Sequence, residues 1–154
     1  MVPTRLLHLQ AAVMAFGLAA CSPLVLQNVN FGWPVESVVT VSPSNAVQEG
    51  RYALSFSVAP LAAAEFGDST ALRGTSLRLM RNVEGYYFVT GPKFKHVYVF
   101  TPRDGALTRY AALEVSTTGL GDPAFNLRPP YVELIDPGSA PRLLTSSDIV
   151  EGKK

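Results

Sequence analysis

The chain has 154 residues and a mass of 16.5 kDa, with 13 basic and 12 acidic side chains. With 47% hydrophobic and 16% charged residues it is too apolar for a disordered protein, and its length allows one domain with a hydrophobic core rather than several. A formal charge of +1 argues against a nucleic-acid-binding protein, so no nucleic acid is expected as a partner.

Residues 1–20 have the features of a secretory signal peptide. Arg5 is followed by a run without charged residues from Leu6 to Ala20. The most apolar part, residues 11–20, is too short for a membrane span of about 20 residues. The run ends in Leu18-Ala19-Ala20-Cys21. This motif resembles the lipobox of bacterial lipoproteins.

The resemblance to lipoproteins implies a processing site and a membrane anchor. Cleavage would fall between Ala20 and Cys21, and the Cys21 thiol would carry diacylglycerol while its new amino group receives a further acyl chain. Two or three chains hold a protein at a membrane, whereas one chain binds only marginally. The alternative is an ordinary secretory signal with an incidental cysteine. Cys21 is the only cysteine in the chain and stands where the motif requires it.

The expected location is the bacterial cell envelope. Ser22, rather than Asp, follows Cys21. In lipoproteins of Gram-negative bacteria this favours the periplasmic leaflet of the outer membrane, with the inner membrane and the cell surface as alternatives. Residues 21–34 would form a short tether that is more apolar than a flexible linker, with Leu24, Val25, Leu26, Phe31 and Trp33. We expect this tether either to pack on its own domain or to lie against the membrane or a partner protein.

Alternating apolar and polar residues predict an antiparallel β domain over residues 35–145. The expected strands are residues 35–41, 51–59, 75–81, 86–90, 95–101, 107–116 and 131–135. Turn residues at 82–85 and 102–105 join the four strands from residue 75 to residue 116 into a meander. The strand from residue 95 is apolar on both faces, which predicts a place inside the sheet. The predicted fold class is all-β, a sandwich or small barrel of about seven strands.

The remaining segments carry weaker signals. A helix is expected only at residues 61–66, directly after Pro60. Residues 119–130 are rich in Gly, Pro and Asp and are predicted to form an irregular loop. Residues 146–154 are predicted to be a polar C-terminal tail.

Residues suited to catalysis or metal binding are few. His96 is the only histidine after residue 20 and has no Asp or Glu beside it in the sequence, which argues against a metal site and against a Ser-His-Asp triad. No glycine-rich phosphate loop and no recognisable carboxylate spacing is present. We therefore expect no catalytic residue, no metal and no cofactor other than the covalent lipid on Cys21, and interpret His96 as a structural or surface residue.

A basic band with interleaved aromatic residues is the candidate for binding. Residues 73–109 carry seven basic and two acidic side chains. The residues of a possible docking or anion-binding face are Arg78, Arg81, Tyr86, Lys93, Lys95, Tyr98 and Arg109. Arginine and tyrosine often anchor protein interfaces, and a basic face attracts anions. Ordinary solvated charges and core aromatic residues are the alternative interpretation.

Two hypotheses for the function follow. The first is a non-catalytic lipoprotein that serves as an accessory, assembly or docking subunit of a membrane-associated envelope complex, with a protein partner and with the membrane held through the lipid. The second is a binding module for an anionic envelope glycan or lipid, such as lipopolysaccharide or a cell-wall polymer.

Overall fold

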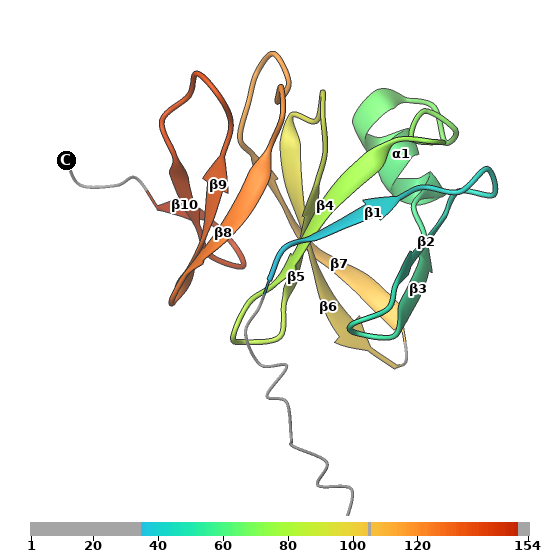
Figure 1. Ribbon diagram of the computed structural model, residues 1–154, viewed down its shortest axis with the longest axis horizontal. Coiled ribbons are helices and arrows are strands. Elements are labelled where there is room, and N and C mark those ends of the chain that lie inside the picture. Colours follow the sequence, from blue (N-terminus) through green and yellow to red (C-terminus); the bar gives the residue numbers. More distant parts are fainter. Residues whose placement is uncertain (1–34, 105, 151–154) are drawn as a thin grey trace, which may run out of the picture. The chain divides into compact units, whose positions relative to one another are not determined.

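The computed structural model describes residues 35–104 and 106–150, which all belong to one compact unit. The predicted signal peptide, Cys21 and the tether lie outside the described residues. Within them the chain forms antiparallel strands and one short helix (Figure 1). The all-β class predicted from the sequence is confirmed.

The strands are more numerous than expected and form three sheets. In chain order the elements are β1 Ser37–Thr40, β2 Ala46–Glu49, β3 Leu54–Ser57, α1 Ala59–Phe66, β4 Ser76–Arg81, β5 Tyr87–Thr90, β6 His96–Arg103, β7 Ala106–Glu114, β8 Ala124–Arg128, β9 Tyr131–Ile135, β10 Arg142–Leu144 and β11 Ile149–Val150. A five-stranded sheet has the order β1-β4-β5-β6-β7, a four-stranded sheet the order β11-β10-β9-β8, and β2 pairs with β3.

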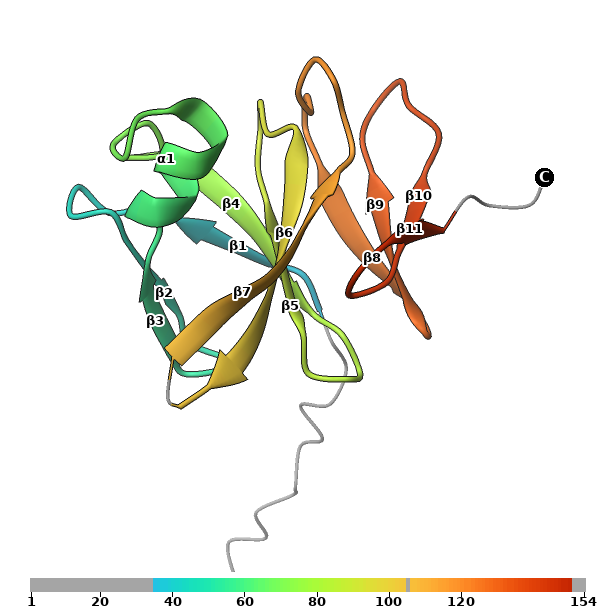
Figure 2. The same ribbon diagram turned by 180° about the vertical axis from the view of Figure 1, so that it is seen from behind.

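The five-stranded sheet is covered on both faces, and the core lies against it. All four residues of β5 are buried. On one face the ring of Phe88 meets Phe125 of β8 at a centroid distance of 6.4 Å, and on the other Tyr87 meets Tyr52, next to β3, at 5.7 Å. Figures 1 and 2 show the four-stranded sheet on one side and α1 with β2 and β3 on the other. Burial on both faces explains the continuous apolar sequence of the inner strands.

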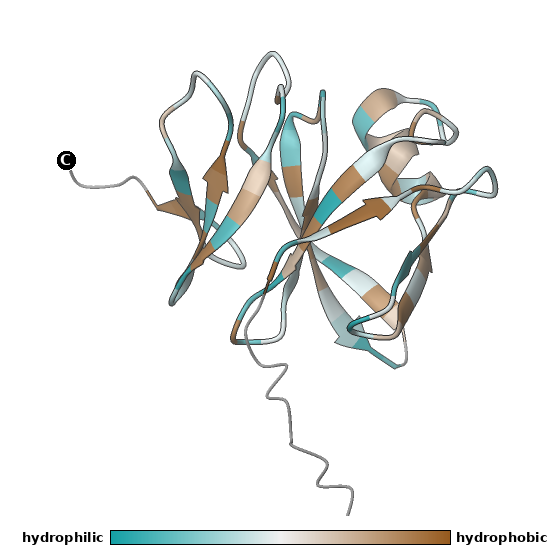
Figure 3. Ribbon diagram, in the orientation of Figure 1, coloured by the Kyte–Doolittle hydropathy of each residue, from teal (hydrophilic) through white to brown (hydrophobic). Residues whose placement is uncertain are grey.

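The predicted meander is confirmed as β4–β5–β6–β7, each strand pairing with the next. Polar and apolar residues alternate over the first four residues of β4, and Figure 3 shows teal and brown bands along this strand. In the turn after β4, the side-chain oxygen of Asn82 accepts the backbone N–H groups of Glu84 and Tyr86 at 3.1 and 2.9 Å, and Gly85 has a φ of 93°. Local turn chemistry therefore sets this part of the topology.

Three predicted segments were wrong in part. The strand expected at 51–59 begins only at Leu54, because it pairs with β2, which the sequence analysis missed. The irregular loop expected at 119–130 contains β8, which pairs with β9 from Ala124↔Ile135 to Arg128↔Tyr131. The tail expected at 146–154 contains β11, so the domain continues beyond residue 145 to residue 150. These strands are short, and each is stabilised by its neighbour rather than by a long alternating pattern.

The helix α1 begins two residues before the predicted start. Pro60 stands in its first turn, where the missing N–H group costs no helical hydrogen bond. The helix ends at Phe66, and the following Gly67 caps it with a left-handed φ of 74° and donates its N–H to the carbonyl of Ala63. Leu61 and Ala62 are its buried residues.

Gly119 and Gly121 allow a matched test of the backbone conformation in the loop that follows β7. Its φ is 100°, and a Cβ built on it would lie 2.9 Å from the carbonyl oxygen of Lys93, whereas a Cβ on Gly121 would lie 3.6 Å from the Asp136 carboxylate, its nearest neighbour. Gly119→Ala is expected to lower the free energy of unfolding by about 2 kcal/mol, and Gly121→Ala by much less. Urea unfolding of both variants checks this, and equal effects would contradict the left-handed backbone conformation at Gly119.

Candidate functional site

Glu65, in the last turn of α1, carries a buried carboxylate. Its side chain is 1% exposed and accepts hydrogen bonds from the Tyr98 hydroxyl at 2.7 Å, from His96 Nδ1 at 2.9 Å and from the backbone N–H of Lys95. Because an ionised carboxylate can only accept, His96 Nδ1 carries a proton and donates it to Glu65. These contacts fasten α1 to the start of β6.

Burial and hydrogen bonding act in opposite directions on the pKa of Glu65. Burial raises the pKa, but the hydrogen bonds from Tyr98, the Lys95 backbone and His96 together outweigh it and hold the pKa below its ordinary value. The pKa of Tyr98 is raised, first by burial and then by its hydrogen bond to Glu65 and the charge of that carboxylate. At neutral pH Glu65 is therefore charged and Tyr98 keeps its proton.

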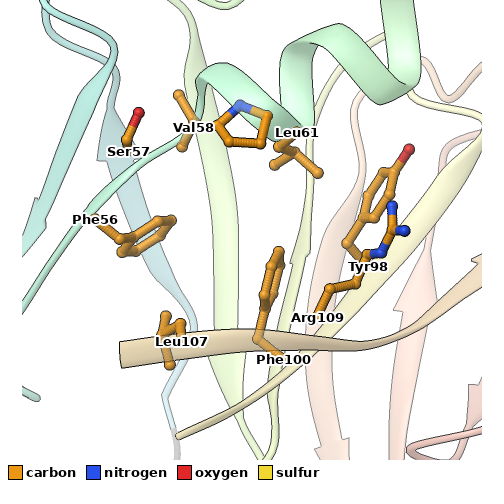
Figure 4. A pocket seen from close by; sticks show the side chains of 9 residues that line it. Phe56, Ser57, Val58, Leu61, Tyr98, Phe100, Leu107 and Arg109 are labelled. Carbon is orange, nitrogen blue, oxygen red and sulfur yellow. The ribbon is translucent and has the colours of Figure 1, made fainter. Parts of the chain in front are cut away.

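A pocket of about 360 Å³ lies beside this cluster, between the β3–α1 connection and strands β6 and β7 (Figure 4). Its lining residues are Phe56, Ser57, Val58, Pro60, Leu61, Tyr98, Phe100, Leu107 and Arg109. The volume falls in the range of about 300–1,000 Å³ that is usual for small-molecule sites. The walls are mostly aliphatic and aromatic, with few polar groups.

Two of the polar side chains in the wall already have partners. The Ser57 hydroxyl oxygen accepts the backbone N–H of Ala59 at 3.3 Å, and the Tyr98 hydroxyl donates to Glu65. Arg109 belongs to none of the ion pairs formed among residues 35–104 and 106–150. Arg109 and Tyr98 both line the pocket (Figure 4). Arg109 is thus the charge that the pocket wall offers to a ligand.

A β-bulge brings Arg109 to this wall. The register of β6 and β7 runs from Val99↔Ala111 directly to Phe100↔Arg109, so Tyr110 is an extra residue. In a regular ladder Arg109 would share the face of Ala111, two residues away. The extra residue moves Arg109 to the opposite face, where Phe100 and Tyr98 also lie.

The residues of the predicted docking or anion-binding face do not lie on one surface, so their grouping as a single face was wrong, while binding by individual members stays a prediction. Arg78 lies on the opposite side of the sheet from Tyr98, since Leu79, not Arg78, shares the cross-strand row of Tyr98. Arg78 pairs with Glu36 and Asp122, each at 3.2 Å. Alternation of side chains in strands separates residues that are close in the sequence.

The other predicted residues have separate surroundings. Arg81 lies 6.0 Å from the ring centroid of Tyr52 and 5.8 Å from that of Tyr87. The ring of Tyr86 packs on Tyr110 at 4.9 Å. Lys93 and Lys95 are exposed in the loop between β5 and β6. Of the predicted set only Tyr98 and Arg109 meet at the pocket.

The outer edge of β7 is a second feature of this region. β7 is nine residues long, pairs with β6 alone, and makes no other backbone hydrogen bond within the described part of the chain. Val115 donates its N–H to the carbonyl of Lys95 at 2.8 Å, and bonded and non-bonded pairs alternate along an antiparallel ladder. The N–H and carbonyl of Ala112 therefore point away from β6.

Neither Glu65 nor the apolar wall of the pocket was predicted from the sequence. One local signal was available, because Glu65 stands in the last turn of a helix, where the helix dipole disfavours a negative charge and calls for a compensating contact. The partners of Glu65 are about 30 residues further along the chain, so only the fold brings them together.

Comparisons of the chain with protein-family models, with curated proteins and with solved structures found no match. In residues 35–104 and 106–150 no helix has the length and apolar character that a membrane span requires. Those residues also hold no group of three or more His, Cys, Asp and Glu side chains placed to bind a metal ion.

The buried carboxylate predicts a pH-dependent stability. The lowered pKa of Glu65 stabilises the fold above the unfolded-state pKa of about 4.3, and this stabilisation is lost as the pH falls through the lower folded-state pKa. Glu65→Gln is expected to lower the free energy of unfolding by about 1–3 kcal/mol at pH 7 and by less at pH 3.

Urea unfolding at both pH values, compared with the exposed control Glu114→Gln, measures this difference. If Glu65→Gln lowers the free energy of unfolding by the same amount at pH 7 and at pH 3, the charge of Glu65 does not stabilise the fold.

Proposed function

We propose that this chain is a lipid-anchored, non-catalytic accessory subunit of a bacterial envelope complex. Its β domain docks a partner protein, which adds an extended segment to the outer edge of β7. The observation that carries the docking proposal is the nine-residue strand whose outer edge has no backbone partner in the described part of the chain. Strand addition of this kind supplies affinity through main-chain hydrogen bonds.

The composition of β7 supports the proposal that a partner strand covers its outer edge. Exposed edge strands are usually protected against uncontrolled pairing by lysine, proline or inward-pointing charges. β7 contains neither lysine nor proline, and its residues from Tyr110 to Leu113 are uncharged. The bulge at Tyr110 and the charged side chains of Arg109 and Glu114 give some protection, but the uncharged residues beyond the bulge pair regularly with β6. A partner strand would satisfy these backbone groups and remove the risk of aggregation.

An aromatic pair next to the edge adds an anchor for a partner. Tyr110 is 51% exposed, and its ring packs on Tyr86 at 4.9 Å. Tyrosine is one of the residue types enriched among the side chains that contribute most to protein interfaces. Tyr86 belongs to the residues that the sequence analysis proposed for docking.

Binding of an anionic glycan or lipid polymer has less support. It needs several free cations on one surface, yet Arg78 is paired with two carboxylates and Arg81 lies over two tyrosine rings. The exposed Lys93 and Lys95 remain available to such a ligand.

The anchor is tested on the N-terminal peptide. The lipobox-like motif predicts that the membrane-extracted protein begins at Cys21 and carries a diacyl or triacyl mass. Cys21→Ser is expected to abolish the lipid mass and move the protein from the membrane to the soluble fraction, because no thioether can form. Mass spectrometry of the peptide checks this, and a peptide that retains residues 1–20 or lacks lipid would refute the anchor.

Docking is tested by a matched pair of substitutions in β7. Ala112→Pro removes the outward N–H, while Ala112→Val keeps it, so the proline variant alone should lose strand addition. A photo-crosslinking amino acid at Thr108 of the full chain, in its own membranes, is expected to capture one stoichiometric partner protein through an extended segment. Ala112→Pro should reduce this crosslink at least tenfold.

Thermal melting of both Ala112 variants controls for folding. Three results would overturn the docking proposal: equal crosslinking in the two variants, crosslinks only to a second copy of this chain, or equal capture from the exposed control position Val83 on the β4–β5 turn.

A further inference from the structure

We infer that the pocket between α1 and strands β6 and β7 binds an apolar monocarboxylic acid, whose carboxylate pairs with Arg109 and whose hydrocarbon part fills the pocket. This site goes beyond partner docking and does not depend on it. The hydrocarbon would contact the walls from β3, α1, β6 and β7, while the docked segment of a partner would pair with the backbone edge of β7.

The pocket walls select an apolar ligand. Phe56, Val58 and Leu61 form one side and Phe100 and Leu107 form the other (Figure 4). A sugar or a peptide backbone would lose hydration here and find few partners, because the Tyr98 hydroxyl already donates to Glu65 and the Ser57 hydroxyl, which accepts the Ala59 N–H, has a single O–H left to donate. A hydrocarbon chain or ring has no polar groups whose hydration would be lost, and its transfer from water into the pocket is favourable.

The positive charge of Arg109 favours a ligand with a single negative charge. Arg109 has no carboxylate partner among the described residues, and its planar guanidinium group fits a carboxylate with two parallel hydrogen bonds. Glu65 does not line the pocket, and its charge is engaged by Tyr98, His96 and the Lys95 N–H. A phosphate monoester, with a charge of nearly two, would be only half neutralised by one arginine.

The architecture indicates that this arrangement is built rather than incidental. The bulge at Tyr110 is what turns Arg109 toward Phe100 and Tyr98, and β-bulges often serve to re-aim a side chain next to a functional site. The opposite wall is held by the hydrogen bonds of Glu65, which fix α1 on β6. Both walls are thus set before a ligand enters, which lowers the entropic cost of binding.

The test uses the full-length protein in nanodiscs of neutral phosphatidylcholine. A photoreactive decanoic acid with a diazirine at the chain end, and the matching alcohol, are added separately, and labelled peptides are quantified by mass spectrometry. We expect the acid to label peptides that contain residues 56–61 and 98–109, several-fold more than the alcohol does.

Substitutions separate the contribution of the Arg109 charge to ligand binding from that of the cavity. Arg109→Gln should reduce labelling by the acid about tenfold and leave labelling by the alcohol unchanged. Arg103→Gln is the matched control, because Arg103 lies on the same hairpin, is 76% exposed and does not line the pocket. Leu107→Trp, which fills the cavity, should reduce labelling by both probes, with thermal melting as the check on folding.

The inference is overturned by any of three results. These are no labelling of the pocket peptides, equal labelling by acid and alcohol, and equal effects of Arg109→Gln and Arg103→Gln. None of these results bears on strand addition at β7, which the Ala112 variants test separately.

Discussion

The buried carboxylate of Glu65 is the contact on which the rest of the site depends. A helix of eight residues is too short to be stable by itself, and α1 buries only Leu61 and Ala62. Besides these and the edge-to-face contact of Phe66 with Phe94 at 5.3 Å, the helix is held in position by the hydrogen bonds that Glu65 accepts from Tyr98, His96 and the Lys95 backbone. Since Pro60 and Leu61 of α1 form part of the pocket wall, the same contacts determine the shape of the pocket.

The bulge in β7 connects the two proposed binding features. One inserted residue, Tyr110, moves Arg109 to the face of the sheet that carries the pocket. The same residue remains exposed and packs on Tyr86, beside the open edge of the strand. A single irregularity in the hydrogen-bond ladder thus turns Arg109 toward the pocket and leaves Tyr110 exposed against Tyr86, where we propose that a partner docks. A change in the length of β7 would affect both.

The basic band of the sequence is divided by the sheet into parts with different roles. Arg78 joins β4 to Glu36 and Asp122 and so helps to hold the four-stranded sheet against the five-stranded one. Arg81 covers Tyr52 and Tyr87, and so shields aromatic surface near β3. Arg109 alone is directed to the pocket. Charge counted along a sequence therefore says little about charge on a surface when strands alternate between two faces.

Local chemistry in the sequence determined the all-β class, the meander β4–β7 and the bounds of β9, because alternation and turn residues act over a few positions. The sequence also contains the lipobox-like motif, and the lipid anchor that this motif implies stays a prediction. It did not determine β2, β8, β10 or β11, which have too few residues for a periodic pattern and depend on their neighbours. The tertiary structure alone decided which face Arg109 occupies and that Glu65 meets His96, 31 residues away. Both follow from strand register and packing, which join parts of the chain that no local pattern relates.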